Sequence, residues 1–115
     1  MEAVANGKYV RMSPRKVRRV AELIRGKQVD DAINTLLFTP KAAARPVEKV
    51  LRSAVANLIN KKEVSEKVDP EKLFIKEVRI DEGPTLKRFR AASMGRVMRI
   101  RRRTTHIQIR VTSEI

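Results

Sequence analysis

The stretch LKRFRAASMGRVMRIRRRTTHIQI, which runs from Leu86 to Ile109, decides the fold of this 115-residue chain. It contains eight lysines and arginines and no aspartate or glutamate. Like charges at this density oppose compaction, yet the stretch ends in an alternating pattern that is typical of a β-strand. The sequence therefore predicts an extended segment whose charge is neutralised by a partner outside the chain.

Alternation before and after the arginines predicts a two-stranded hairpin. From Leu73 the period changes to two, with Phe74, Val78 and Ile80 as the apolar residues that alternate with Glu77, Arg79 and Asp81. At the other end Ile107, Ile109 and Val111 alternate with polar residues. A period of two is typical of strands that bury one face. With a turn near residues 91–94, each strand is about twice as long as the usual ~5–6 residues.

The length of this hairpin divides the chain into a body and an arm. At ~3.3 Å per residue each strand spans roughly 40 Å, whereas a small domain is about 30 Å across. We therefore expect a single domain over residues 1–115, with a body of about 1–80 and 107–115 and a basic hairpin arm of about 81–106. A bare two-stranded ribbon is at best marginally stable in water, so we expect an anionic partner to enclose the arm.

An amphipathic helix is predicted between Ser13 and Gly26. Ser13 suits the N-cap, Pro14 fits the first helical position, and Gly26 suits a left-handed stop. Four apolar residues repeat at helical spacing between these signals and should form one buried stripe. The stripe consists of Val17, Val20, Ala21 and Ile24.

Two further helices are expected downstream. One spans Asp30 to Phe38 and is capped by Asp30, and the next is capped by Thr39, with Pro40 at its first position. Pro46 then lies inside the third helix, which it should kink or fray over the first turns. The apolar stripe of the third helix comprises Val47, Val50, Leu51, Ala54, Val55, Leu58 and Ile59.

Composition excludes several classes of function. The chain has no cysteine, which rules out disulfides, zinc–thiolate sites and thiol catalysis. Its only histidine, His106, cannot form a metal site alone, and the carboxylates of Glu77 and Asp81 have Arg79 as an easy ion-pair partner. No apolar run approaches the ~18 residues that span a bilayer. We therefore expect no enzyme, no cofactor, no metal, no small-molecule substrate and no membrane contact.

The charge of the chain points to a nucleic acid. Lysines and arginines number 27 against 13 acidic residues, which gives a net charge of +14. A small protein with this excess destabilises itself unless a polyanion binds it. The first predicted helix carries a second cationic patch, and its N-terminus with Ser13 also suits a phosphate. The patch contains Arg11, Arg15, Lys16, Arg18 and Arg19.

The residues alone leave more than one partner open. Aromatic residues make up only 3% of the chain, which argues against a sheet that reads unpaired bases and favours recognition of folded RNA by its shape and backbone. The alternative is a free DNA-architectural or nucleoid protein that uses a basic β-arm, although such proteins generally dimerise through a large apolar surface. A membrane-active protein is disfavoured, because the helical apolar faces are needed for the core.

Three blocks of the sequence resemble the bacterial form of the L-twenty-two family of large-subunit ribosomal proteins. The blocks are Tyr9 to Val20 followed by Leu23 to Lys27, Asp81 to Pro84 followed by Lys87 and Arg88, and Gly95 and Arg96 followed by Arg103 to Val111. The resemblance covers nearly the whole chain. It implies an α+β fold with three helices packed on a small antiparallel three-stranded sheet and a long protruding β-hairpin arm. A short strand over residues 3–11 and a polar loop over residues 61–70 fit this fold.

The function that the resemblance implies is structural. Such a protein is a constituent of the large ribosomal subunit, binds 23S rRNA and bridges rRNA domains during assembly. Its hairpin tip reaches the wall of the nascent-peptide exit tunnel. The implied partners are 23S rRNA, neighbouring large-subunit proteins and the nascent peptide near the tip, and the implied location is cytoplasmic, in the ribosome.

The same resemblance assigns roles to residues of this chain. Together with Arg19 of the helical patch, the body contacts to rRNA would be Arg11, Ser13, Arg15, Lys16, Arg18, Arg25 and Lys27. The arm contacts would be Lys87, Arg88, Arg90, Gly95, Arg96, Arg99, Arg101, Arg102, Arg103, Thr104, Thr105 and His106. The tunnel-facing tip would be Arg90, Ala91, Ala92, Ser93 and Met94, a stretch that lacks the proline usual in the family.

Overall fold

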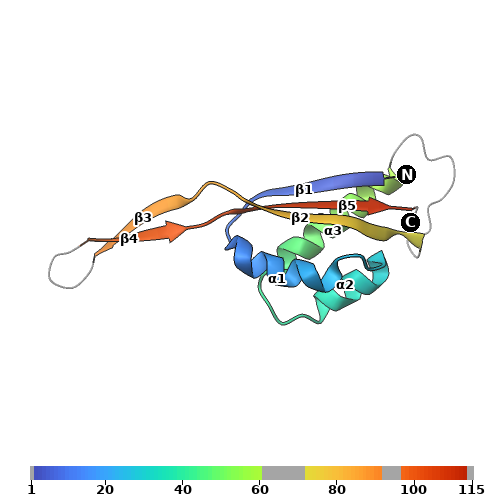
Figure 1. The fold of residues 1–115 in the computed structure, drawn as a ribbon, viewed down its shortest axis with the longest axis horizontal. Coiled ribbons are helices and arrows are strands. Elements are labelled where there is room, and N and C mark those ends of the chain that lie inside the picture. The colour runs from blue at the N-terminus through green and yellow to red at the C-terminus, as the bar shows by residue number, and fades with distance from the viewer. Residues whose placement is uncertain (1, 61–71, 92–96, 114–115) are drawn as a thin grey trace.

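Eight helices and strands follow one another along the part of the chain that the structure describes (Figure 1). The structure is a computed structural model, and it describes residues 2–60, 72–91 and 97–113. The predicted loop over residues 61–70 lies outside the described residues. The elements are β1 (Glu2–Val10), α1 (Pro14–Ile24), α2 (Val29–Leu37), α3 (Ala44–Ile59), β2 (Phe74–Glu82), β3 (Leu86–Ala91), β4 (Val97–Arg102) and β5 (Thr105–Thr112).

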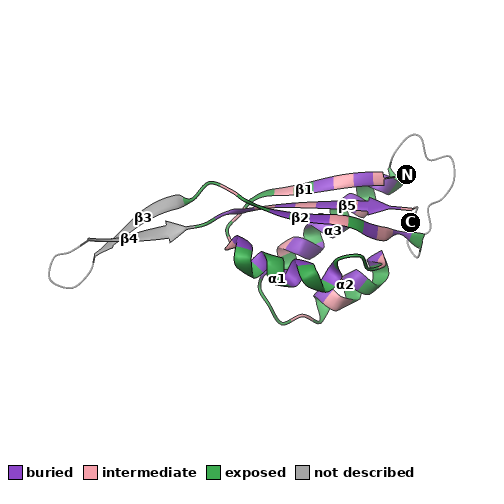
Figure 2. Cartoon of the chain, in the orientation of Figure 1, coloured by how far each residue is buried: buried purple, intermediate pink, exposed green. Residues whose placement is uncertain are grey.

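A three-stranded antiparallel sheet forms the centre of the body. β5 is the middle strand, with β1 and β2 paired to its two edges. Its alternate residues Ile107, Ile109 and Val111 are buried. Figure 2 shows β5 largely in the purple of buried residues, on the side of the sheet that the helices cover. The predicted α+β class, with three helices on a three-stranded antiparallel sheet, is therefore confirmed. The first strand also matches its prediction to within one residue at each end.

The first helix forms where the sequence predicts it. Ser13 has the extended conformation of an N-cap, and Pro14 occupies the first helical position. Beyond the C-terminal end, Gly26 has a φ of +75°, which glycine adopts without a steric penalty. All four residues of the predicted stripe are buried, so the helix presents its remaining, mostly charged side chains to solvent.

The start of the second helix was predicted wrongly. α2 begins at Val29 with Gln28 as its N-cap, so Asp30 lies in the first turn and does not cap the helix. Pairing with the sheet fixes this start, because the Val29 N–H donates a 2.9 Å hydrogen bond to the carbonyl oxygen of Leu73. Asp30 still favours the helix, since an acidic side chain in the first turn interacts well with the helix dipole.

The start of the third helix was also predicted wrongly. α3 begins at Ala44 with Ala43 as its N-cap, and Thr39 and Pro40 lie outside it. A helix that began at Pro40 would hold Pro46 in its interior, where proline loses a backbone hydrogen bond and its ring clashes with the preceding turn. With the start at Ala44, Pro46 falls in the first turn, where its missing N–H costs nothing. The expected fraying before Pro46 is thus observed.

β2 contains a β-bulge, which makes the predicted alternation of buried residues wrong at the start of the strand. The pairing of β2 with β5 shifts between Ile75 and Glu77. The shift changes which residues face the helices, so Ile75 is buried with Val78 and Ile80 instead of Phe74. An extra residue in one strand moves the following side chains to the opposite face, which simple alternation in the sequence cannot reveal.

The arm extends the molecule far beyond the helices. β3 and β4 form a separate two-stranded antiparallel sheet, and Figure 1 shows them projecting away from the body. The principal dimensions of the molecule are 66 × 28 × 17 Å, so the long axis is more than twice the second. The two long strands that the sequence predicts are each divided in two, at residues 83–85 and 103–104. Proline at position 84 explains the first break, because it has no N–H for strand pairing.

Candidate nucleic-acid interface

Four cationic residues at the start of α1 form an exposed surface that we call the helix patch. They lie on the side of α1 opposite its buried stripe, or just before the helix. Their side chains have no hydrogen-bond or ion-pair partner within the described part of the chain. The helix begins where β1 ends, close to the base of the arm (Figure 1). The helix patch consists of Arg11, Arg15, Lys16 and Arg19.

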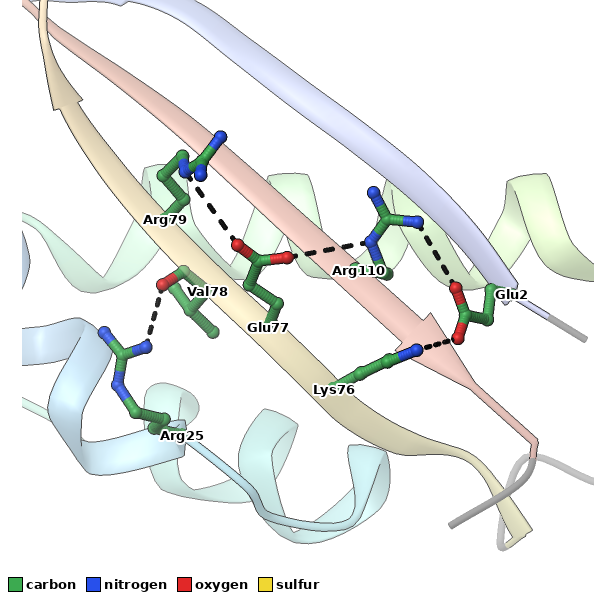
Figure 3. Close-up of polar contacts among 7 residues, drawn as sticks. All are labelled: Glu2, Arg25, Lys76, Glu77, Val78, Arg79 and Arg110. Carbon is green, nitrogen blue, oxygen red and sulfur yellow. Dashed lines mark hydrogen bonds and ion pairs between the residues drawn. The ribbon is translucent and has the colours of Figure 1, made fainter.

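Arg18 and Arg25 differ from the helix patch because they contact the protein itself. Arg18 Nη2 donates a 3.1 Å hydrogen bond to the carbonyl oxygen of Ile80. Arg25 Nη1 donates a 2.9 Å hydrogen bond to the carbonyl oxygen of Val78 (Figure 3). The Nη2 atom of Arg25 also forms a 3.2 Å ion pair with Glu22. Because a guanidinium group has five N–H donors, both arginines keep donors for an anion.

The beginning of α1 and the residue after its end complete the body sites expected from the sequence. Ser13 is at the N-cap, but its hydroxyl makes no hydrogen bond to the helix, so it is available to another acceptor. Lys27 is exposed beyond the helix, and its Nζ lies 3.4 Å from the Thr35 hydroxyl oxygen. Neither residue contributes to the hydrophobic core.

Two buried threonines fix the base of the arm, one by a bond between its two chain segments and the other by a bond to the body. Thr104 is 3% exposed and its hydroxyl donates to the carbonyl oxygen of Pro84 at 2.5 Å. Thr105 is fully buried, and its hydroxyl donates to the carbonyl oxygen of Met12 at 2.6 Å. These side chains present almost no surface to a partner in this conformation. The neighbouring Arg103, in contrast, is exposed at this point of the chain.

His106 lies on the outer face of the sheet and contacts the end of β1. Its Nδ1 accepts a 3.1 Å hydrogen bond from the backbone N–H of Tyr9. The two rings also meet edge to face, with centroids 5.0 Å apart and an interplanar angle of 89°. Because Nδ1 accepts this bond, the neutral ring carries its proton on Nε2.

For the remaining arm residues, either the position of the backbone alone is described or the residue lies outside the described ranges. β3 and β4 pair in register from Leu86 opposite Arg102 to Ala91 opposite Val97. For residues 86–91 and 97–102 the structure describes the backbone without the side chains. The residues placed by backbone are Lys87, Arg88, Arg90, Ala91, Arg99, Arg101 and Arg102. The residues outside the described ranges are Ala92, Ser93, Met94, Gly95 and Arg96.

The outer face of the sheet is different, because its charges neutralise one another. Figure 3 shows a chain of ion pairs that crosses all three strands of the body. Glu2 pairs with Lys76 and, at 3.3 Å, with Arg110, which lies 3.7 Å from Glu77. Arg79 closes the chain at 3.8 Å from Glu77, as the sequence predicted. The hydrogen bond from Lys76 is the main cause that lowers the pKa of the Glu2 carboxylate below its usual 4.5, and Arg110 assists it.

Two groupings that other functions require are absent from the described residues, a metal-ligand cluster and a membrane-spanning helix. No cluster of three or more potential metal ligands occurs among them. None of the described helices is long and apolar enough to cross a membrane. The contrast between free cations on α1 and paired charges on the sheet is therefore the principal chemical feature of the described surface.

Sequence reasoning missed Tyr9 as a candidate site residue. Its side chain is 64% exposed and it is next to an expected RNA contact, His106. The backbone of Tyr9 has a φ of +58°, the one positive value among the described non-glycine residues. The sequence carries no signal for this conformation, because tyrosine is not a residue that favours it.

These features define a class of small, basic α+β proteins with unpaired cations on a helix and a projecting β-hairpin. The comparisons with known proteins give the particular family. The family model described as Ribosomal protein L22p/L17e matches residues 5–112, and the chain belongs to this family. It is therefore a ribosomal protein with a structural role and not an enzyme, as the sequence predicted.

Similar proteins match along nearly the full chain. A protein named Large ribosomal subunit protein uL22 from Desulfitobacterium hafniense (strain Y51) is 52% identical over 113 residues, which cover 98% of this chain and 96% of that protein. The protein of the same name from Myxococcus xanthus is 48% identical over 109 residues, or 95% and 94% of the two chains. The one from Clostridioides difficile is 49% identical over 109 residues, or 95% of each chain. Membership of the family confirms the expected location in cytoplasmic ribosomes.

Proposed function

We propose that this chain is a constituent of the large ribosomal subunit that binds 23S rRNA through the helix patch, the base of the arm and the arm itself. The arm inserts between rRNA segments and neutralises their phosphates, which allows segments that would repel one another to pack together during assembly. Its tip lies at the wall of the peptide exit tunnel, beside the nascent peptide. Other large-subunit proteins are its neighbours.

The observation that carries this proposal is the unequal pairing of charge on the body. Basic side chains occur on both α1 and the sheet, but Lys76, Arg79 and Arg110 of the sheet are paired with Glu2 and Glu77. The helix patch has no such partners in the described part of the chain. Unpaired arginines bind phosphate oxygens in a fork and lose little on leaving water, so the helix patch is the surface that suits RNA.

The position of the helix patch supports a contact that continues onto the arm. The hydroxyl of Thr105, at the base of the arm, bonds to the carbonyl of Met12, which lies between Arg11 and the start of α1. Arg103 is two residues before Thr105 and is exposed. The cations of the body and of the arm therefore meet at the arm base, and one folded RNA can bind both.

Salt dependence of binding tests the proposal. The affinity of the full chain for a 23S rRNA transcript is measured by filter binding over a range of salt concentrations. Each phosphate that a cation neutralises contributes about −0.9 to the slope of log affinity against log salt for duplex RNA of similar charge density. We expect a steep negative slope, and we expect Arg15→Gln to make it shallower by about one contact.

Arg79→Gln is the matched control because it removes the same charge from the paired face of the sheet. It should change the slope less than Arg15→Gln does, since Arg79 already has Glu77 as a partner. A slope near zero for the unaltered chain would reject RNA binding by charge. Equal effects of the two variants would reject the assignment of the contact to the helix patch.

A further inference from the structure

Tyr9 has a backbone conformation that is unusual for its residue type. The pairing of β1 with β5 is regular up to Gly7 and resumes at Val10, and Tyr9 lies in the irregular segment between them with a φ of +58°. A bulky side chain rarely adopts this region without support from its surroundings. The hydrogen bond from its N–H to His106 Nδ1, at 3.1 Å, provides that support.

The consequence of this conformation is that the Tyr9 ring is held outside the core. The side chain is 64% exposed, although an aromatic residue is normally among the most buried groups of a small protein. The only ring contact of Tyr9 within the described residues is the edge-to-face contact with His106. Because 64% of the side chain is exposed, much of the Tyr9 ring remains accessible to solvent.

Exposed cations flank Tyr9 along the chain, while the exposed Asp81 lies opposite His106 in the pairing of β2 with β5. Lys8 and Arg11 are exposed on either side of Tyr9 in the chain. Arg103 is exposed near the same point, since Val10 pairs with Thr105 at the base of the arm. A flat apolar face flanked by cations matches an unpaired nucleotide, whose base stacks on the ring while its phosphates meet the cations.

We propose that Tyr9, supported by His106, is a stacking site for an unpaired RNA base at the point where the arm leaves the body. This inference rests on the proposed function and deepens it, because it adds a contact to a base to the contacts with phosphates. A single open ring stacks with any of the four bases, so the site positions the RNA without reading its sequence. The bound strand follows the cations from Arg11 to Arg103.

Two variants of Tyr9 separate the ring from the backbone. Tyr9→Phe keeps a ring and should bind the 23S rRNA transcript as tightly as the unaltered chain. Tyr9→Asn removes the ring, and asparagine tolerates a positive φ, so the fold of β1 is retained. We expect Tyr9→Asn to lower the affinity roughly tenfold, the effect typical of losing one stacked base. The slope against salt should stay unchanged, because no charge is removed.

The environment of the Tyr9 ring can be measured directly, because Tyr9 is the only tyrosine of the chain and tryptophan is absent. In chain labelled with 3-fluorotyrosine, the single ¹⁹F resonance should move on addition of the rRNA transcript and stay in place on addition of a fully paired RNA duplex. An unmoved resonance, or Tyr9→Asn binding as tightly as the unaltered chain, would overturn the stacking site. If the steep salt slope persists in that case, RNA binding by the helix patch stands. A flat slope would reject both proposals.

Discussion

Arg18 in α1 donates a hydrogen bond to the carbonyl oxygen of Ile80, 62 residues later in the chain. β2 is an edge strand of the three-stranded sheet, so the carbonyls on its outer side have no strand to pair with. Arg18 and Arg25 bond to two of these carbonyls, at Ile80 and Val78. An edge that is covered in this way is protected from pairing with another chain. Part of the positive charge of α1 therefore stabilises the fold.

The first prediction separates structural arginines from RNA-binding arginines. Arg18→Gln should lower the free energy of unfolding by about 1 kcal/mol, because it removes a charged donor from a partly exposed hydrogen bond. Arg19→Gln should change stability by less than about 0.5 kcal/mol, since Arg19 has no partner within the described residues. Urea denaturation gives both values, and filter binding gives the RNA affinity. Equal losses of stability would contradict the role of the edge contact.

The second prediction concerns the close approach of Gly83 to the base of the arm. A Cβ at this position would lie 2.5 Å from Thr104 Oγ1 and 3.1 Å from His106 Cε1. Gly83→Ala should therefore destabilise the protein by about 1–3 kcal/mol through overpacking. The cost should be smaller in a Thr104→Ala background, where the nearest atom is absent. A double-mutant cycle by urea denaturation measures this coupling. Strictly additive effects of the two substitutions would refute the contact.

The third prediction is a loss of stability in acid through Glu2. Its carboxylate has a pKa below 4.5 in the folded protein, mainly because Lys76 donates to it and also because of Arg110. Since the folded pKa is lower than the unfolded one, this stabilisation is complete above the unfolded pKa. It disappears as the pH falls through the folded pKa. Glu2→Gln should therefore lose less stability than the unaltered chain on acidification, as followed by urea unfolding at several pH values.

The control for Glu2 is Glu82→Gln, which alters an exposed carboxylate near the arm. Glu82 has no ion pair with another described residue. This variant should retain the acid sensitivity of the unaltered chain. If Glu2→Gln and Glu82→Gln follow the same curve, the ion-pair chain across the sheet does not carry the acid response.

Local signals predicted much of this fold, and contacts between distant residues decided the rest. Val17, Val20, Ala21 and Ile24 were identified from helical spacing alone, and Gly26 was identified as the stop. The start of α2 could not be predicted locally, because it depends on a hydrogen bond to Leu73, the residue just before β2. The bulge in β2 reverses the expected facing of Phe74 and Ile75 for the same reason. The start of α3 follows from Pro46, which is favourable in the first turn of a helix and unfavourable in its interior, whereas Thr39 and Pro40 lie outside the helix.

The candidate interface likewise combines features that the sequence predicts with features that depend on contacts between distant residues. Charge and spacing in the sequence predicted the cationic residues of α1 and just before it, which include all four residues of the helix patch. They could not show that Arg18 and Arg25 bond to β2, nor that Thr104 and Thr105 are buried, because those contacts join segments far apart in the chain. Tyr9 was missed because its exposure depends on a backbone conformation that tyrosine rarely adopts.

The central claim is that an anionic partner encloses the arm, and amide hydrogen exchange of β3 and β4 tests it most directly. Within the described residues these strands pair only with each other, and an isolated two-stranded ribbon is marginally stable in water. Amides of β3 and β4 should therefore exchange rapidly in the free chain and become strongly protected when 23S rRNA binds. Amides of β5 should be protected in both states. Protection of β3 and β4 that is the same with and without the RNA would contradict the account.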